Sequence, residues 1–118
     1  MYLGGSLPLP AALAARAARL AVRAVGCLSP SRGYLGVDLV LGDDPGGVAD
    51  VVIEINPRLT TSYVGLRALL EGNLAATMLA IAAGQSPELC WKTGPIAFDA
   101  AGGVRQSGGS QGREQGAA

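Results

Sequence analysis

The chain has 118 residues, of which 49% are hydrophobic, and its nine Lys and Arg residues balance nine Asp and Glu residues to a net charge of zero at pH 7. This length accommodates one small domain at most, and the balanced charge gives no electrostatic reason to expect nucleic acid or a membrane as a partner. The sequence contains no histidine, which excludes Ser-His-Asp and Cys-His catalysis within these residues and directs attention to oxygen ligands and hard metal ions.

The first part of the chain predicts a loop followed by a helix. Residues 1–8 contain two glycines, a serine and a proline, so we interpret them as a loop or a truncated segment. The alanine-rich run from Ala11 to Val25 predicts a helix, with Pro10 suited to its first turn. Three arginines share one side of this helix and form either a solvated face or a patch that binds an anion or nucleic acid; they are Arg16, Arg19 and Arg23.

These arginines also interrupt the first apolar stretch, which argues against a signal peptide and against a membrane span. Cys27 and Cys90 are far apart in the sequence and form no CxxC pattern, so neither a zinc site nor a disulfide framework is indicated. Thiols of this kind are typical of a reducing compartment. We therefore expect a cytoplasmic protein.

The centre of the chain predicts an antiparallel hairpin. Apolar residues alternate along residues 34–41 and again along residues 51–56, and the segment 42–50 between them is dense in turn-forming residues. Such a pattern is typical of two strands joined by a long loop. In the second strand, alternation assigns Val52, Glu54 and Asn56 to one face and Val51, Ile53 and Ile55 to the other.

The register of this hairpin brings two carboxylates together. If Leu41 pairs with Val51, then Asp38 stands directly opposite Glu54. Opposed side chains have Cβ atoms about 4.5 to 5.5 Å apart, and like charges at that distance are destabilising, so a positive group is expected between them. A divalent cation such as magnesium fits, and Asn56 could add a carbonyl oxygen. The alternative is that the two carboxylates are unrelated and lie on a solvated face.

Beyond the hairpin, the sequence predicts two helices and a short strand pair. A Thr60-Thr61-Ser62 cluster is suited to cap a helix that begins near Tyr63. Residues 71–73 are expected to interrupt it, with Asn73 as the N-cap of a second helix over residues 74–83. Trp91 and the run 96–98 are expected to form strands around a turn at residues 92–95. Residues 101–118 are rich in Gly, Ser, Gln and Ala and predict a disordered tail.

Two of these motifs together carry a resemblance to a known family. The run from Gly33 to Val40, followed by Glu54 to Arg58, resembles the C-terminal catalytic subdomain of the ATP-grasp ligases. The resemblance covers roughly residues 7 to 100, and the run 59–67 further resembles a tyramine-glutamate ligase-like subgroup. It implies an α+β fold with an antiparallel sheet and flanking helices, and it implies that residues 9–100 form the C-terminal subdomain.

The resemblance also implies the site and its chemistry. Asp38, Glu54 and Asn56 take the positions that hold magnesium, or manganese, against the phosphates of ATP. Arg58 takes a position that contacts phosphate or the bound carboxylate, as a catalytic and binding residue. Thr60 and Thr61 would contribute hydroxyls and helix-start N–H groups to the same anion. The implied reaction joins a small carboxylate substrate to an amine through an acylphosphate.

One departure from the family leaves the activity of this chain open. A complete ATP-grasp ligase has an N-terminal portion whose lysines reach the phosphates, whereas this sequence has a single lysine, Lys92, outside the two motifs. We therefore expect the C-terminal piece of a ligase, inactive alone and needing the missing N-terminal portion as its partner. Such a piece could arise from a truncated or mis-started gene, a split gene or deliberate shortening. The alternative is a non-catalytic α+β module that binds a ligand or a protein partner.

Overall fold

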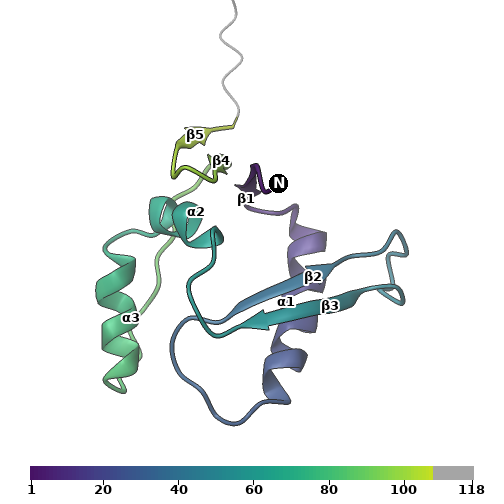
Figure 1. Ribbon diagram of the computed structural model, residues 1–118, viewed down its shortest axis with the longest axis horizontal. Coiled ribbons are helices and arrows are strands. Elements are labelled where there is room, and N and C mark those ends of the chain that lie inside the picture. Colours follow the sequence, from purple (N-terminus) through teal and green to yellow (C-terminus); the bar gives the residue numbers. More distant parts are fainter. Residues whose placement is uncertain (108–118) are drawn as a thin grey trace, which may run out of the picture.

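Helices and antiparallel strands make up the part of the chain that the computed structural model describes, residues 1–107 (Figure 1). In chain order the elements are β1 (Gly4–Leu7), α1 (Ala11–Gly26), β2 (Gly36–Val40), β3 (Val51–Asn56), α2 (Ser62–Leu69), α3 (Leu74–Ala82), β4 (Ile96–Asp99) and β5 (Val104–Gln106). The strands form a two-stranded sheet of β2 and β3 and a three-stranded sheet in the order β1-β4-β5, with every pairing antiparallel. The expected α+β class, with antiparallel sheets and flanking helices, is confirmed.

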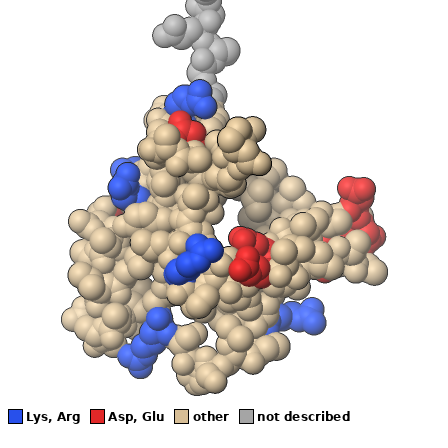
Figure 2. Space-filling view, viewed as in Figure 1, with Lys and Arg blue, Asp and Glu red and all other residues tan. Residues whose placement is uncertain are grey.

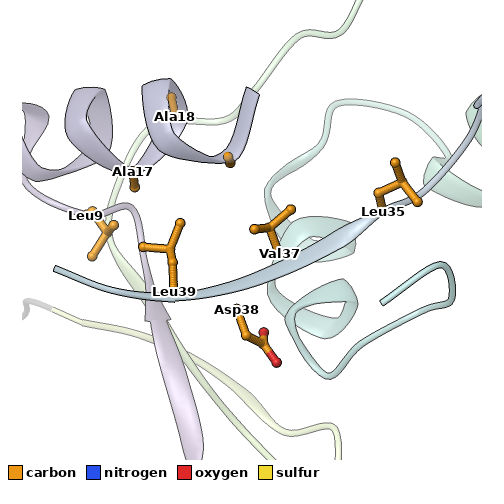
Figure 3. Close-up of a pocket in the computed structure, with 8 residues that line it drawn as sticks. Leu9, Ala17, Ala18, Leu35, Val37, Asp38 and Leu39 are labelled. Carbon is orange, nitrogen blue, oxygen red and sulfur yellow. The ribbon is translucent and has the colours of Figure 1, made fainter. Parts of the chain in front are cut away.

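Helix α1 lies across one face of the β2–β3 ribbon and contacts both strands (Figure 1). Its start at Ala11 is as predicted, and its end at Gly26 is one residue beyond the predicted one. Val37 and Leu39 of β2 point toward the helix, while Asp38 between them points away (Figure 3). The helix offers mainly alanine to this interface, and a pocket of about 660 Å³ remains between α1 and β2. The helix therefore covers the sheet without burying any residue of its own.

The hairpin register is confirmed at the carboxylates and shifted beyond them. Asp38 pairs with Glu54, but a β-bulge follows, so that Val40 and not Leu41 lies opposite Val51. Because cross-strand partners share a face, Val52 joins Leu39 on the α1 side. The expectation that Val52 shares a face with Glu54 is therefore wrong, since one extra residue in a strand reverses the alternation.

The observed strand pairings correct three expectations. Strand β1 occupies part of residues 1–8, which were expected to be a loop, and it pairs with β4. Strand β5 lies inside the expected tail, so that expectation is wrong for residues 101–107, while 108–118 lie outside the described residues. The hairpin predicted around residues 92–95 is also wrong, because Trp91 forms its bridge with Leu70. Short Gly-rich segments carry little strand propensity of their own, and here distant pairing partners decide their structure.

The apolar core lies between this sheet and helix α2. Phe98 of β4 is 5% exposed, and its ring lies between two glycines. A Cβ added to Gly5 would come within 2.8 Å of the ring, and one added to Gly65 within 2.7 Å. The glycines therefore permit the close approach of β1 and α2 to the ring. The buried hydrophobic residues are Leu69, Leu70, Leu74, Ile96 and Phe98.

Helices α2 and α3 follow the predicted pattern closely. Helix α2 ends at Leu69, and the predicted interruption is present, with Gly72 at a φ of 111°. Asn73 is the N-cap of α3, and its side chain accepts a hydrogen bond from the Ala76 amide at 3.0 Å, as expected. Within residues 1–107, no helix has the length and apolar character needed to cross a bilayer.

Candidate functional site

Two carboxylates face each other on the side of the hairpin away from α1. Asp38 and Glu54 are paired across β2 and β3, and both side chains are exposed. Within the described residues, neither forms an ion pair with a basic side chain. The positive group expected between two opposed carboxylates is thus not supplied by residues 1–107. This is the arrangement that a bound cation would stabilise.

Asn56 ends strand β3 beside these carboxylates and is the only buried polar residue of the described part, with 4% of its surface exposed. Its Nδ2 donates a hydrogen bond to Asp38 Oδ2 at 3.3 Å. The side chain therefore holds the Asp38 carboxylate from one side. For the amide oxygen to ligate a cation shared with Asp38, the amide must turn over and exchange this hydrogen bond for the ion.

Gly36 makes the space in which Asn56 and Thr60 meet. It is the cross-strand partner of Asn56, and a Cβ on it would lie 2.5 Å from the Thr60 methyl carbon and 3.6 Å from Asn56 Cβ. Any larger residue would push Thr60 away from the end of the sheet. Gly36, in the Leu-Gly-Val-Asp run, is therefore required for the close packing of Thr60 against the end of the sheet beside Asn56.

These three side chains fit a hard divalent cation by the chemistry of their donors. Two carboxylates and one amide supply oxygen ligands, and magnesium is usually bound through one or two carboxylates with water and phosphate oxygens completing the shell. Within residues 1–107, no group of three or more His, Cys, Asp or Glu side chains is close enough to hold a metal. The described residues therefore form no all-protein metal cage, and the three donors would leave coordination positions open to water or phosphate oxygens.

A pocket of about 400 Å³ opens beside Asp38, and hydroxyl groups line it. Ser62 is the first residue of α2, Thr60 lies two residues before it, and Tyr34 comes from the segment before β2. The Tyr34 hydroxyl and Thr60 Oγ1 are 2.9 Å apart, and the Tyr34 ring meets Tyr63 edge to face, with centroids 6.3 Å apart. The pocket therefore places hydroxyl donors next to an acidic side chain, an arrangement that can position an anionic group near a metal ion.

The structure brings only some of the predicted anion-binding residues to this pocket. Thr60 lines it, but Thr61 is exposed and does not. The helix begins at Ser62, one residue earlier than predicted, so Thr61 is the N-cap of α2. Its side chain makes no capping hydrogen bond. Arg58 is exposed, and its Nη1 donates to the Leu59 carbonyl at 3.3 Å, with no hydrogen bond or ion pair to the carboxylates. Thr61 and Arg58 thus remain candidates on sequence grounds alone.

Tyr34 is a pocket residue to which the sequence assigned no role, whereas Ser62 belongs to the hydroxyl cluster that was expected to cap the helix or to bind an anion. Tyr34 stands directly before the alternating strand, and Ser62 begins the helix that follows the Asn-Pro-Arg run. The hydroxyl-rich cluster at residues 60–62 was the sequence signal for Ser62. The first turn of α2 begins at Ser62, and this residue lines the pocket. For Tyr34 no local pattern indicates that the ring turns toward Thr60.

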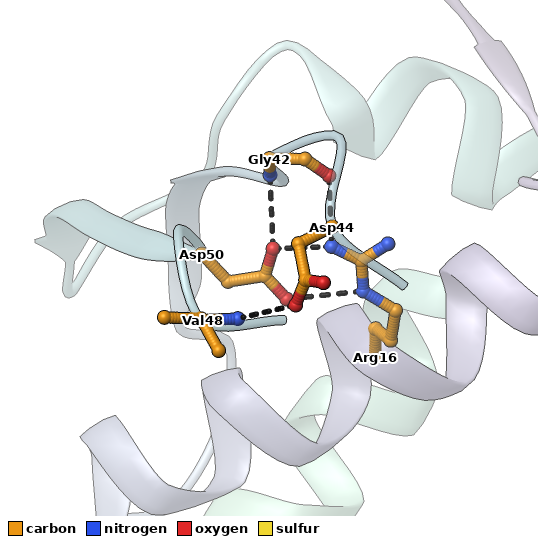
Figure 4. Close-up of polar contacts among 5 residues, drawn as sticks. All are labelled: Arg16, Gly42, Asp44, Val48 and Asp50. Atoms are coloured by element: carbon orange, nitrogen blue, oxygen red, sulfur yellow. Dashed lines mark hydrogen bonds and ion pairs between the residues drawn. The ribbon is translucent and has the colours of Figure 1, made fainter. Parts of the chain in front are cut away.

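An ion pair fastens α1 to the far end of the hairpin (Figure 4). The Arg16 guanidinium contacts both carboxylate oxygens of Asp50 and donates to the Gly42 carbonyl at 2.9 Å. The Gly42 amide donates to the same carboxylate at 2.9 Å. The two side chains retain 10% and 8% of their exposure, so the interpretation of all three helix arginines as a solvated face is wrong for Arg16.

These contacts shift the ionisation of both partners. Hydrogen bonding to Arg16 is the main cause that lowers the pKa of Asp50 below its ordinary value, with the Gly42 amide adding to the effect. The pKa of Arg16 is raised by the same bond. Elsewhere on the face shown in Figure 2, basic and acidic side chains are interspersed without a broad area of one sign.

Comparison with known proteins identifies similar sequences. Residues 1–62 match the family model of the ATP-grasp domain. The chain is 36% identical over 66 residues to a tyramine–L-glutamate ligase of Methanocaldococcus jannaschii, and 35% identical over 66 residues to that of Methanocaldococcus fervens. Each match covers 56% of this chain and 20% or 21% of the relative. The matched part thus spans about a fifth of the length of these curated relatives. No solved structure matches the chain.

Proposed function

The chain belongs to the ATP-grasp family, and from that premise we propose that it is the C-terminal, metal- and ATP-binding part of an ATP-dependent carboxylate-amine ligase. The observation that carries this proposal is the pairing of Asp38 with Glu54 beside Asn56. Opposed carboxylates without a basic partner in the described residues repel each other and are destabilising. A cation bound between them would offset this repulsion. The family match supplies the reason to expect that cation beside ATP.

Each residue then has a role that follows from its chemistry. Asp38 and Glu54 hold a magnesium or manganese ion through their carboxylates, and Asn56 adds an amide oxygen. When bound, the ion neutralises charge on the phosphate oxygens of ATP. Arg58 orients a phosphate or the substrate carboxylate from the rim. Thr60 and Thr61 bind the same anion, with Thr60 placed in the pocket beside Asp38.

The proposed reaction has two steps. A substrate carboxylate attacks the γ-phosphorus of ATP, the bond to the β-phosphate oxygen breaks, and an acylphosphate and ADP form. An amine then attacks the acyl carbon, forms the amide bond, and releases inorganic phosphate and a proton. The two relatives are named for tyramine and L-glutamate, an amine and a carboxylic acid, and these are the two substrate classes that we propose.

We propose that the 118 residues by themselves bind the metal ion and ATP but do not catalyse the reaction. The sole lysine, Lys92, donates its Nζ hydrogen bond to the Ala68 carbonyl at 3.2 Å and lines neither the pocket beside Asp38 nor the carboxylate pair. Phosphoryl transfer depends on cationic groups that stabilise the transferred phosphate. An N-terminal ligase portion that provides them is the proposed partner.

The proposal is tested by manganese binding, because free Mn²⁺ is counted directly by electron paramagnetic resonance. We expect the 118-residue chain to bind Mn²⁺ more tightly when ATP is present. In Glu54→Gln the affinity should fall by at least the 10- to 100-fold that the loss of an outer-shell partner causes in metal sites. Asp43→Asn is the matched control, because Asp43 is an exposed carboxylate of the β2–β3 loop that makes no hydrogen bond in the described structure.

Two results would contradict the proposal. One is Mn²⁺ affinity that is equal in the wild type, Glu54→Gln and Asp43→Asn. The other is the absence of binding by the wild-type chain at millimolar Mn²⁺ and ATP, which would instead favour a module without nucleotide chemistry.

A further inference from the structure

An apolar pocket of about 520 Å³ lies where β1, α2 and the segment 91–94 meet. It shares only Leu66 with the pocket beside Asp38 and contains none of the proposed metal ligands. Its volume falls in the range of about 300 to 1,000 Å³ that is typical of small-molecule sites. The lining residues are Leu7, Pro8, Leu66, Leu69, Trp91, Lys92, Thr93 and Gly94.

Backbone hydrogen bonds hold one wall of this pocket in place. The Lys92 amide donates to the Leu69 carbonyl at 2.7 Å, and the Glu71 amide donates to the Cys90 carbonyl at 2.8 Å. These two bonds form an antiparallel bridge between Trp91 and Leu70, which is 2% exposed. The segment that carries Trp91 is therefore anchored to the best buried residue of the core, and the pocket wall is preformed.

The same wall brings hydrogen-bond donors and a positive charge to an otherwise apolar pocket. Lys92 is the only charged residue among those that line it. Its ammonium uses one donor on the Ala68 carbonyl, which leaves two donors for a ligand. The next two backbone amides, of Thr93 and Gly94, have no acceptor within residues 1–107. Three consecutive residues thus present donors and no carboxylate.

Trp91 contributes a large flat surface beside these donors. The residue is 44% exposed, although its backbone is fixed in the bridge. An indole in a partly open apolar pocket presents a face on which another ring can stack. Apolar walls with a few converging donors are the usual composition of sites that bind small organic molecules.

We propose that this pocket binds a small, flat aromatic molecule that carries one carboxylate. The ring lies against Trp91, Leu66 and Leu69, and the carboxylate accepts hydrogen bonds from Lys92 and from the amides of Thr93 and Gly94. A neutral ring loses the charge-assisted bonds, and a cationic ring meets the ammonium of Lys92. The site is therefore selective for the anion. It does not depend on the metal site or on ATP.

The test uses naphthoate as the probe and the neutral naphthalenemethanol as its matched control. Trp91 is the only tryptophan of the chain, so its indole N–H gives a single signal in a ¹⁵N-labelled sample of the full 118 residues. We expect this signal to shift saturably with naphthoate and to require about tenfold more naphthalenemethanol, because hydrogen bonds to a charged group are stronger than neutral ones.

Three variants at exposed positions show whether the affinity for naphthoate depends on the charge of Lys92 or on a general change in the structure. In Lys92→Gln, the affinity for naphthoate should fall about tenfold, to that of the neutral ring. Lys92→Arg keeps the charge and should retain the preference for the anion. Arg67→Gln removes a positive charge from an exposed position of α2 that does not line the pocket, and it should leave the affinity unchanged.

The proposal is overturned by equal affinity for the two probes, or by an equal loss in Lys92→Gln and Arg67→Gln. It is also overturned if the Trp91 signal does not respond to naphthoate. A signal that moves with protein concentration, and not with the probe, would show that a second copy of the chain covers the pocket.

Discussion

The two halves of the described chain are held together in different ways. The β2–β3 hairpin and α1 carry the carboxylates and lie within the part that matches the ATP-grasp family, yet they contain no buried hydrophobic residue. All five buried hydrophobic residues come after residue 62, from α2 to β4. The candidate chemistry and the apolar core thus occupy separate regions. Polar contacts such as the Arg16–Asp50 pair add to loose apolar packing in the first region, whereas close packing positions the second.

The contrast is clearest in what fixes each helix. Helix α1 is fastened by Arg16, which reaches Asp50 and the Gly42 carbonyl. Helix α2 is held by apolar packing, because Gly65 has no side chain and Phe98 and Leu7 can therefore pack closely against the helix. A change in pH or salt should therefore act on α1, and a change in volume should act on α2.

The largest effect is expected from Phe98→Ala. Removing a buried aromatic ring typically costs about 3 to 5 kcal/mol of unfolding free energy, which is a large part of the stability of a small domain. Denaturant unfolding followed by circular dichroism measures the loss. Leu39→Ala in the open α1 interface is the comparison. A loss as large as that of Phe98→Ala would contradict the division into a packed and an unpacked region.

Gly65→Ala should cost about 1 to 3 kcal/mol, because the added methyl overlaps the Phe98 ring and Leu7 in a packed core. Gly26→Ala is the matched control, since a Cβ at the end of α1 meets nothing within 4 Å. Thermal unfolding of the two variants gives the difference. Equal midpoints would show that the contact around Phe98 is looser than described.

A smaller effect is expected when the α1 region is acidified. The lowered pKa of Asp50 means that the unfolded chain takes up this proton first, so the pair stabilises the fold above the unfolded pKa of about 3.9. That stability is lost as the pH falls from there through the folded pKa. Asp50→Asn should remove this part of the acid dependence. Unfolding curves from pH 6 to pH 2 check it, and identical slopes for both proteins would count against the ion pair.

The smallest effect, and the only favourable one, is expected from Glu54→Gln without metal. Removing one of two opposed carboxylates relieves a repulsion of roughly 0.2 to 1 kcal/mol, so the variant should unfold at slightly higher denaturant. With Mn²⁺ and ATP present, the order should reverse, because only the wild type gains stability from the bound ion. A variant that is less stable in both conditions would mean that Glu54 has a structural role.

Local patterns were sufficient for the elements that carry the candidate site. Alternation and turn residues predicted the hairpin. Counting from an assumed Leu41–Val51 pair placed Asp38 opposite Glu54, as the structure shows, but Val51 pairs with Val40, and the two carboxylates face each other only because of the bulge. Asn73 was recognisable as a cap because its side chain acts on an amide three residues away. The bulge was not predictable, because nothing in residues 51–55 marks Ile53 as the residue without a cross-strand partner.

The sequence by itself therefore determined the helices and the hairpin, which depend on residues close together in the chain, whereas the bulge that sets Asp38 opposite Glu54 appeared only in the structure. Only the tertiary structure decided that β1 pairs with β4, that Arg16 meets Asp50 and that Trp91 bridges Leu70. The physical reason is that a short strand, a surface arginine or a lone indole has many acceptable partners. Which of them is chosen depends on the packing of segments far apart in the sequence.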